Sequence, residues 1–211
     1  MTWQPTRRAV PTIVLTGGPC AGKSRMIADL PSLMRERLGW HVITVPETVT
    51  WMGDHGMRRE DFPDIVTFQS VQTRIQASHE DDAIEAATLM HDDHVLVLMD
   101  RGVPDASAYL SSDEYSRVLR ANGLSEALVM GRYDTAIFLH TVACGHGSLY
   151  ARQGNAMRIE RDASDAVLAD ERTMRAYATH QNVIEIADTV TISEKTERVL
   201  DAIAKSLPRI W

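Results

Sequence analysis

The stretch Gly17-Gly18-Pro19-Cys20-Ala21-Gly22-Lys23-Ser24 decides how the rest of the chain folds around it. It matches the pattern G-x-x-x-x-G-K-[ST], in which a glycine-rich turn connects a strand to a helix. Residues 12–16, directly before it, form a short apolar run that predicts a buried strand, and from Lys23 the apolar residues follow helical spacing. The motif therefore has the strand, loop and helix context that a phosphate-binding loop requires.

The residues of this loop indicate how it would hold ATP or GTP. Its glycines let backbone N–H groups converge on phosphate oxygens at a helix N-terminus, where the peptide dipoles favour an anion. We expect Lys23 to reach the β- and γ-phosphates and the Ser24 hydroxyl to ligate Mg²⁺. Arg25 and Arg152 join residues 17–24 as candidate nucleotide-binding residues. Cys20 is either a reactive thiol near a helix N-terminus or a small filler residue.

Strands and helices alternate along the whole chain outside this loop. Further strands are predicted at residues 41–45, 95–99, 135–139 and 183–186. Helices are predicted at residues 23–38 with an interruption at Pro31, at 61–79 with a continuation or restart through 83–90, at 163–179 and at 193–207. This order predicts an α/β P-loop NTPase fold, with a parallel β-sheet flanked by helices on both faces.

Charged residues follow two predicted strands at the point where each strand ends. Asp100 and Arg101 come directly after residues 95–99, and Glu47 follows residues 41–45 after one proline. Ligands of open α/β sheets bind outside the carboxyl ends of the strands. We therefore expect Asp100 to hold Mg²⁺, Arg101 to bind a phosphate or the acceptor, and Glu47 to accept the proton of an attacking hydroxyl. The alternative for each residue is a helix cap or an exposed salt bridge.

The predicted helix at residues 61–79 adds glutamines beside this end of the sheet. Gln69 and Gln76 are candidates to hydrogen-bond an acceptor molecule. The alternative is that they form only the solvated side of an amphipathic helix.

A glycine-bearing stretch at about residues 145–162 contains three arginines, Arg152, Arg158 and Arg161. Arginines on a closing lid can stabilise charge on a transferring phosphoryl group, and the closed lid excludes water. We expect Arg158 and Arg161 to act in catalysis, since they directly precede a predicted helix. The alternative is that these arginines pair with Glu160, Asp162 and Asp165 on a solvated surface.

The bulk composition is that of one globular domain. A chain of 211 residues, 44% hydrophobic and 24% charged, fits a single domain over residues 1–211 with an N-terminal arm at residues 1–11. The net charge of −7 disfavours nucleic acid as a partner. Cys20 and Cys144 form neither a disulfide framework nor a zinc-ligand cluster, and no signal peptide or membrane span is predicted, so we expect a cytoplasmic protein. The sequence leaves a homodimer open.

Together, the phosphate loop, the Glu47 and Asp100-Arg101-Gly102 strand ends, the glutamine-rich helix and the arginine segment resemble the nucleoside and nucleotide kinase branch of P-loop proteins. Within that branch the chain resembles the small single-domain AAA-type ATPases related to nicotinamide riboside kinase domains, from about Thr12 to Leu207. Residues 45–51 are also similar to a segment of deoxynucleoside kinases, which implies that Glu47 is the base and that Trp51 lines the acceptor pocket. The chain departs from those kinases at two positions: Pro46 precedes the glutamate, and Gly102 replaces a serine.

Two hypotheses about function follow. The first is an ATP- and Mg²⁺-dependent kinase that acts on a hydroxyl of a small, nucleoside-like molecule bound by Glu47, Trp51, Gln69 and Arg101. No Asn-Lys-x-Asp guanine signature occurs, which favours ATP and leaves GTP open. The second is a nucleotide-dependent switch that reports to a protein or membrane partner. The switch predicts that Trp40, Trp51, Met52 and Met57 form one exposed surface, whereas the kinase predicts that they are buried around a cleft.

Overall fold

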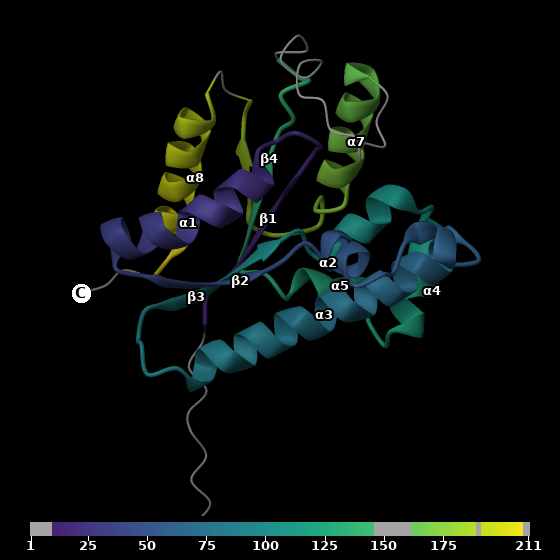
Figure 1. Cartoon of the computed structure of the whole chain (residues 1–211), viewed down its shortest axis with the longest axis horizontal. Coiled ribbons are helices and arrows are strands. Elements are labelled where there is room, and N and C mark those ends of the chain that lie inside the picture. The colour runs from purple at the N-terminus through teal and green to yellow at the C-terminus, as the bar shows by residue number, and fades with distance from the viewer. Residues whose placement is uncertain (1–9, 146–161, 189–190, 209–211) are drawn as a thin grey trace, which may run out of the picture.

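The computed structural model describes residues 10–145, 162–188 and 191–208. Five strands in this part of the chain form one sheet in the order β2-β3-β1-β4-β5 (Figure 1). Every strand pairing is parallel. The strands are β1 (Thr12–Gly17), β2 (His41–Val45), β3 (Val95–Asp100), β4 (Thr135–Leu139) and β5 (Val183–Ile186). The prediction of a parallel sheet in an α/β fold is confirmed.

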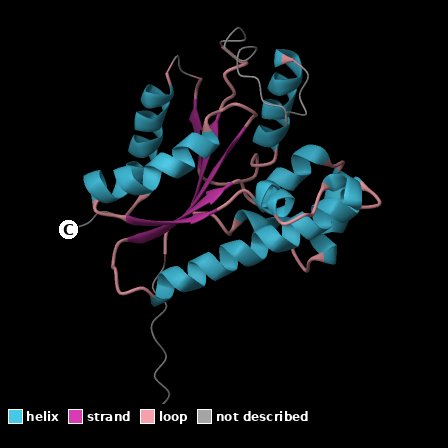
Figure 2. Ribbon diagram, viewed as in Figure 1, coloured by secondary structure: helices cyan, strands magenta, loops and turns pink. Residues whose placement is uncertain are grey.

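Helices lie on both faces of this sheet (Figure 2). They are α1 (Lys23–Leu38), α2 (Thr48–Asp54), α3 (Ile65–Leu89), α4 (Ser112–Ala121), α5 (Glu126–Met130), α7 (Ala163–Arg175) and α8 (Ile192–Ser206), with the 3-10 turns η1 (Arg59–Asp61) and η2 (Val103–Tyr109). No helix among the described residues is long and apolar enough to span a membrane.

A hydrophobic core lies between the sheet and the helices on each of its two faces, because successive strand residues point to opposite faces of the sheet. Ile13 and Leu15 of β1 face α1 and α8, where Met26 and Ile203 are fully buried. Val14, between them, belongs to the opposite core, which α3 covers. The β1 and β3 strands are buried along their whole length, as expected for central strands of a sheet covered on both faces.

The structure corrects two helix predictions. Pro31 does not interrupt α1, which is continuous across it and ends at Gly39, a left-handed cap residue with φ 72°. The predicted helix at residues 61–79 begins instead at Ile65, because the Asp64 side chain accepts a hydrogen bond from the Thr67 backbone N–H (2.7 Å) and caps the helix. It then runs without a break to Leu89.

The parallel pairing brings the carboxyl ends of three strands to one edge of the sheet. Leu15 of β1 is aligned with Asp100 of β3, and Val45 of β2 is aligned with Met99. The loop after β1, Glu47 after β2 and Arg101 after β3 therefore meet at the same edge, where α/β sheets bind their ligands.

Candidate functional site

The loop between β1 and α1 has backbone conformations that only particular residues adopt without strain. Gly17 has φ 138°, and a Cβ atom there would lie 2.0 Å from the Leu139 carbonyl oxygen of the neighbouring strand. Gly22 has φ 95° and comes directly before the first residue of α1. Both glycines of the motif are therefore required by the close approach and by the turn itself. Cys20, which is half-buried, also has a positive φ, 55°.

Lys23 lies inside this loop. Its Nζ donates to the carbonyl oxygens of Gly17 (2.8 Å) and Gly18 (2.7 Å), and the residue is only 8% exposed. Burial, together with the nearby Arg101 cation, lowers the pKa of Lys23 to about 7. An anion bound in the loop would favour the charged form of Lys23.

Ser24 and Arg25 are exposed in the first turn of α1. The position of Ser24 at the start of the helix fits a hydroxyl ligand of Mg²⁺ beside bound phosphates. The Arg25 side chain forms an ion pair with Asp29 one turn along the same helix (2.7 Å).

Arg101 connects the ends of three strands. Its Nε donates to Glu47 Oε1 (2.6 Å) and its Nη1 to Asp105 Oδ1 (3.0 Å), with a weaker contact to the Gly17 carbonyl oxygen (3.5 Å). The residue has φ 65°, which is unusual for a non-glycine residue. Such local strain is found at positions that the surrounding structure fixes firmly. Glu47 and Arg101, predicted separately from two strand ends, are thus direct partners.

The two carboxylates at the strand ends have opposite pKa shifts. Burial and the nearby Glu47 carboxylate raise the pKa of Asp100 to about 6. Burial would also raise the pKa of Glu47, but Arg101 and the Thr50 hydroxyl, which donates to Glu47 Oε2 (2.7 Å), lower it below its ordinary value. Glu47 is therefore the carboxylate that stays ionised, and Asp100 is the one that a cation such as Mg²⁺ would stabilise.

The glutamines of α3 lie on a buried face, so a purely solvated face is excluded for Gln69 (3% exposed) and Gln76 (4% exposed). Gln76 connects α3 to the strand ends. Its amide nitrogen donates to the Arg101 carbonyl oxygen (3.2 Å) and to Glu80 Oε1 (2.9 Å). Its amide oxygen accepts from the Thr48 hydroxyl. By contrast, three buried side-chain oxygens on α3 have no hydrogen-bond donor among the described residues. They belong to Gln69, Gln72 and Thr73.

The structure does not show the single exposed surface that the switch hypothesis predicts for Trp40, Trp51, Met52 and Met57. Met52 is fully buried, and Trp51 and Met57 are half-buried. Trp51 stacks on His55 (ring centroids 4.2 Å apart) and meets the edge of His79. Trp40 is 4% exposed in the core beneath α1 and α8, directly before β2 and therefore at the opposite edge of the sheet.

Two aspartates of the site were not predicted from the sequence. Asp105 in η2 accepts hydrogen bonds from Thr16, Arg101 and the backbone of Gly102, as well as from Tyr177 (2.6 Å). Its spacing of four from Arg101 was the available signal. Asp170 in α7 accepts from the backbone N–H of Gly18 (3.0 Å), 152 positions away, and no sequence pattern indicates that contact.

Glycine at position 102, where deoxynucleoside kinases have serine, is explained by the lack of space for a side chain. A Cβ atom there would lie 2.5 Å from the Tyr133 hydroxyl and 2.9 Å from the Tyr177 hydroxyl. Those two tyrosines occupy the space of a side chain, and Tyr133 also accepts a hydrogen bond from the Val103 backbone (2.9 Å).

The predicted arginine lid lies outside the described residues, and so do Arg152, Arg158 and Arg161. Two of the acids proposed as their partners are described, and both lie at the start of α7. Asp162 caps the helix, accepting from the backbone N–H groups of Ser164 (2.8 Å) and Asp165 (3.0 Å).

Comparison with known proteins agrees with this geometry. A protein-family model described as an AAA domain matches residues 12–195. The match includes the loop after β1, the ends of β2 and β3, and helix α3. A search of curated proteins finds no match.

Proposed function

We propose that this chain is a kinase. The premise is that it belongs to the AAA domain family of P-loop NTPases and so binds a nucleotide. Its reaction would transfer a phosphoryl group from ATP, with Mg²⁺, to a hydroxyl of a small nucleoside-like molecule. The observation that carries this proposal is the ion pair between Glu47 and Arg101. Arg101 also contacts the Gly17 carbonyl oxygen of the loop. This pair supports the proposal because it puts a carboxylate that could act as the base, and a cation that could bind phosphate, beside the phosphate loop.

The residues fit Mg²⁺ and nucleotide, because a buried carboxylate with a raised pKa, Asp100, lies near the Lys23 ammonium group and the start of α1. Bound MgATP would supply the phosphoryl group. Lys23 and the backbone N–H groups of the loop would hold its phosphates, with Ser24 and Asp100 on the Mg²⁺ ion. Arg152, Arg158 and Arg161 remain proposed contributors to phosphate binding and charge stabilisation, since they lie outside the described residues.

Glu47 would accept the proton of the acceptor hydroxyl. A general base must be ionised at working pH, and Arg101 keeps Glu47 in that form. One oxygen of the Glu47 carboxylate accepts from Arg101 Nε and the other accepts from the Thr50 hydroxyl, and the Glu47 side chain is 25% exposed. An acceptor hydroxyl would replace the Thr50 hydroxyl at the second oxygen, and Arg101 would keep the carboxylate oriented.

The acceptor would bind along α3. Burying a polar atom without a hydrogen bond costs free energy. The side-chain oxygens of Gln69, Gln72 and Thr73, which find no donor in the part of the chain that the structure describes, therefore favour a ligand that supplies N–H or O–H donors. A nucleoside-like molecule carries both kinds of donor. Trp51, half-buried on the neighbouring helix α2, would be an apolar wall of this site.

The alternative, a nucleotide-dependent switch with a partner surface at Trp40, Trp51, Met52 and Met57, has less support. Trp40 and Met52 are buried and Trp40 belongs to another edge of the sheet, so these residues offer no contiguous surface to a partner.

The test is product formation from ATP and from GTP with Mg²⁺, against a panel of nucleosides and related alcohols. We expect turnover that depends on the acceptor and that falls at least about a hundredfold in Glu47→Gln, because general base catalysis contributes that much. Lys23→Ala should abolish it. Glu197→Gln is the matched control, since Glu197 also pairs with an arginine, Arg37, but on an exposed surface of α8 (2.7 Å).

Glu47→Gln should still bind nucleotide, because it leaves the phosphate loop intact. The contradicting outcome is nucleotide binding with only slow hydrolysis that no acceptor accelerates and that is equally fast in the Glu47→Gln variant. That result would show that Glu47 is not a base and would favour the switch.

A further inference from the structure

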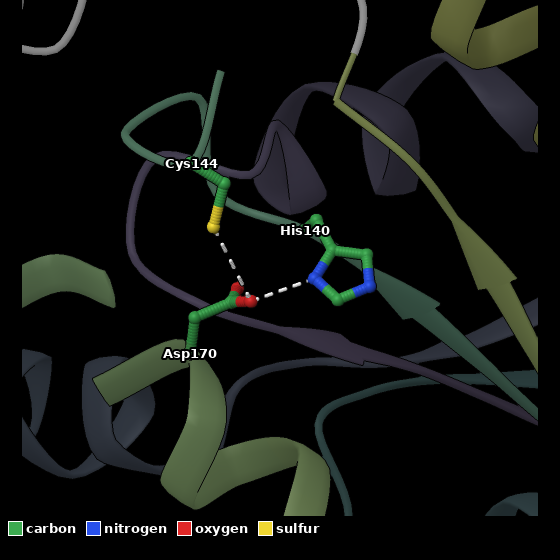
Figure 3. A group of neighbouring side chains, drawn as sticks. All are labelled: His140, Cys144 and Asp170. Atoms are coloured by element: carbon green, nitrogen blue, oxygen red, sulfur yellow. Dashed lines mark hydrogen bonds and ion pairs between the residues drawn. The ribbon is translucent and has the colours of Figure 1, made fainter. Parts of the chain in front are cut away.

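A histidine, a cysteine and an aspartate come together beside the phosphate loop (Figure 3), and only the aspartate is shared with the site described above. His140 directly follows β4, Cys144 lies in the turn after it, and Asp170 is in α7. One donor atom from each residue lies within 4.8 Å of the other two. The cysteines alone predict no zinc cluster, but the fold adds an imidazole and a carboxylate to Cys144.

The carboxylate of Asp170 is held in a fixed orientation. Its Oδ1 accepts from the backbone N–H groups of Gly18 (3.0 Å) and Thr141 (2.9 Å). Its Oδ2 is left facing His140 Nδ1 (2.7 Å) and Cys144 Sγ (3.9 Å), as Figure 3 shows. Asp170 is 2% exposed, so this arrangement is built into the packing of α7 against β1.

His140 is oriented from its other side. Its Nε2 lies 3.1 Å from Glu185 Oε2 on β5. Metal-binding histidines commonly donate their second ring N–H to a carboxylate, which fixes the ring and makes the ligating nitrogen more basic. A neutral His140 that donates from Nε2 to Glu185 would point the Nδ1 lone pair toward Asp170 and Cys144.

We propose that His140, Cys144 and Asp170 bind a divalent cation of the Zn²⁺ class. Nitrogen, thiolate sulfur and carboxylate oxygen are together the ligands that Zn²⁺ prefers, and three protein ligands leave a fourth position for water. Binding requires no electron transfer: the Cys144 thiol releases its proton to solvent. His140 binds through Nδ1 as the neutral ring with its proton on Nε2, and a second proton on the ring, where present, also goes to solvent. Cys144 is exposed, so the ion can enter from solvent.

The surrounding charge also favours a cation. Glu185 and Asp188 contribute negative charge near the cluster. Among the described residues Lys195, whose Nζ donates to the His140 carbonyl oxygen, contributes positive charge. The ion would also connect to nucleotide binding, because the same Asp170 carboxylate holds the Gly18 backbone of the phosphate loop. This inference does not depend on the kinase reaction.

The experiment uses the full chain, stripped of metal and without an affinity tag, and titrates it with Co²⁺ as a spectroscopic probe for Zn²⁺. We expect one equivalent to produce a thiolate-to-cobalt charge-transfer band and the visible bands of a four-coordinate site, both removed by added Zn²⁺. Cys144→Ser should abolish the charge-transfer band, and His140→Gln should weaken Co²⁺ binding by more than tenfold. Glu185→Gln should weaken it about tenfold without removing a ligand.

Cys20→Ser is the matched control, because it removes the other thiol and should leave the band unchanged. Thermal unfolding in EDTA shows whether each variant is folded before the titration is interpreted. The proposal is overturned if folded protein gives no saturable band at one equivalent, or if the band is lost in Cys20→Ser and kept in Cys144→Ser.

Discussion

Lys23 donates hydrogen bonds to the backbone of its own loop. The two carbonyl oxygens that its ammonium group contacts belong to Gly17 and Gly18, so the side chain is buried in the place where phosphates bind. Because its pKa is lowered to about 7, a large fraction of Lys23 is neutral at neutral pH. Bound phosphates favour the charged form, so nucleotide binding and protonation of Lys23 are coupled.

We therefore predict that nucleotide binding takes up protons. At pH 8 the free lysine is mostly neutral and the bound lysine is charged, so uptake should approach about one proton per site, falling toward zero at pH 6, where the free lysine is already charged. The measurement is calorimetry of ATP binding in EDTA, in buffers with different ionisation enthalpies. Uptake that is independent of pH, or that persists in Lys23→Ala, would show that another group titrates.

At the scale of elements, helix α3 is joined to the segment before β4 by one buried ion pair. Glu80 is fully buried, and it accepts from Arg132 Nε (2.5 Å), the Tyr133 hydroxyl (2.9 Å) and Gln76 (2.9 Å). Burial raises the pKa of Glu80 above its ordinary value in spite of these donors. The same Gln76 contacts Arg101, so this network also positions the candidate active site.

Arg132→Met should lower the free energy of unfolding by roughly 3 kcal/mol at pH 7, because Glu80 keeps its burial and loses its cation. The methionine retains the apolar length of the arginine stem. The loss should shrink as pH falls, since the folded-state pKa of Glu80 lies above the unfolded value and protonation removes the buried charge.

Urea denaturation at several pH values measures this effect. Arg35→Met is the control: Arg35 pairs with Asp92 at 2.8 Å but is 59% exposed, so its loss should be below about 1 kcal/mol. Equal losses in the two variants would mean that the Glu80 pair contributes no more than a surface salt bridge.

The elements that could be predicted from the sequence are those with a long or continuous apolar pattern. The strand at residues 135–139 is buried at every position, and its predicted limits agree with β4. Helices α2, α4 and α5 were not predicted. Helices α2 and α5, with seven and five residues, are too short to show helical spacing. The Ser111 and Ser125 caps that start α4 and α5 were the local signals available.

The residues of the candidate site also fall into those that the sequence could predict and those that it could not. Glu47, Asp100 and Arg101 could be predicted because they stand at the ends of two strands, β2 and β3, and parallel strands end at one edge. Asp170 could not, since its role depends on how α7 packs against β1, and that packing joins residues 152 positions apart. The three-residue cluster with His140 and Cys144 is hidden for the same reason.

At the scale of the whole molecule, nucleotide should stabilise the domain as a unit. The loop joins β1, at the centre of the sheet, to α1, and Asp170 ties the same loop to α7. A ligand that binds only the folded form stabilises it by about 2.7 kcal/mol at a hundred times its Kd.

For a domain of this size that stabilisation should raise the Tm by roughly 5–10 °C, measured by scanning calorimetry at saturating ATP with Mg²⁺. In Ser24→Ala the increase on adding Mg²⁺ to ATP should be lost while the part due to ATP alone remains, because the serine hydroxyl serves the metal and the loop backbone serves the phosphates. A single transition whose midpoint moves with ATP concentration would show that β1, α1 and α7 unfold together. Two transitions, of which only one responds to ATP, would mean that the loop is stabilised without the rest of the sheet.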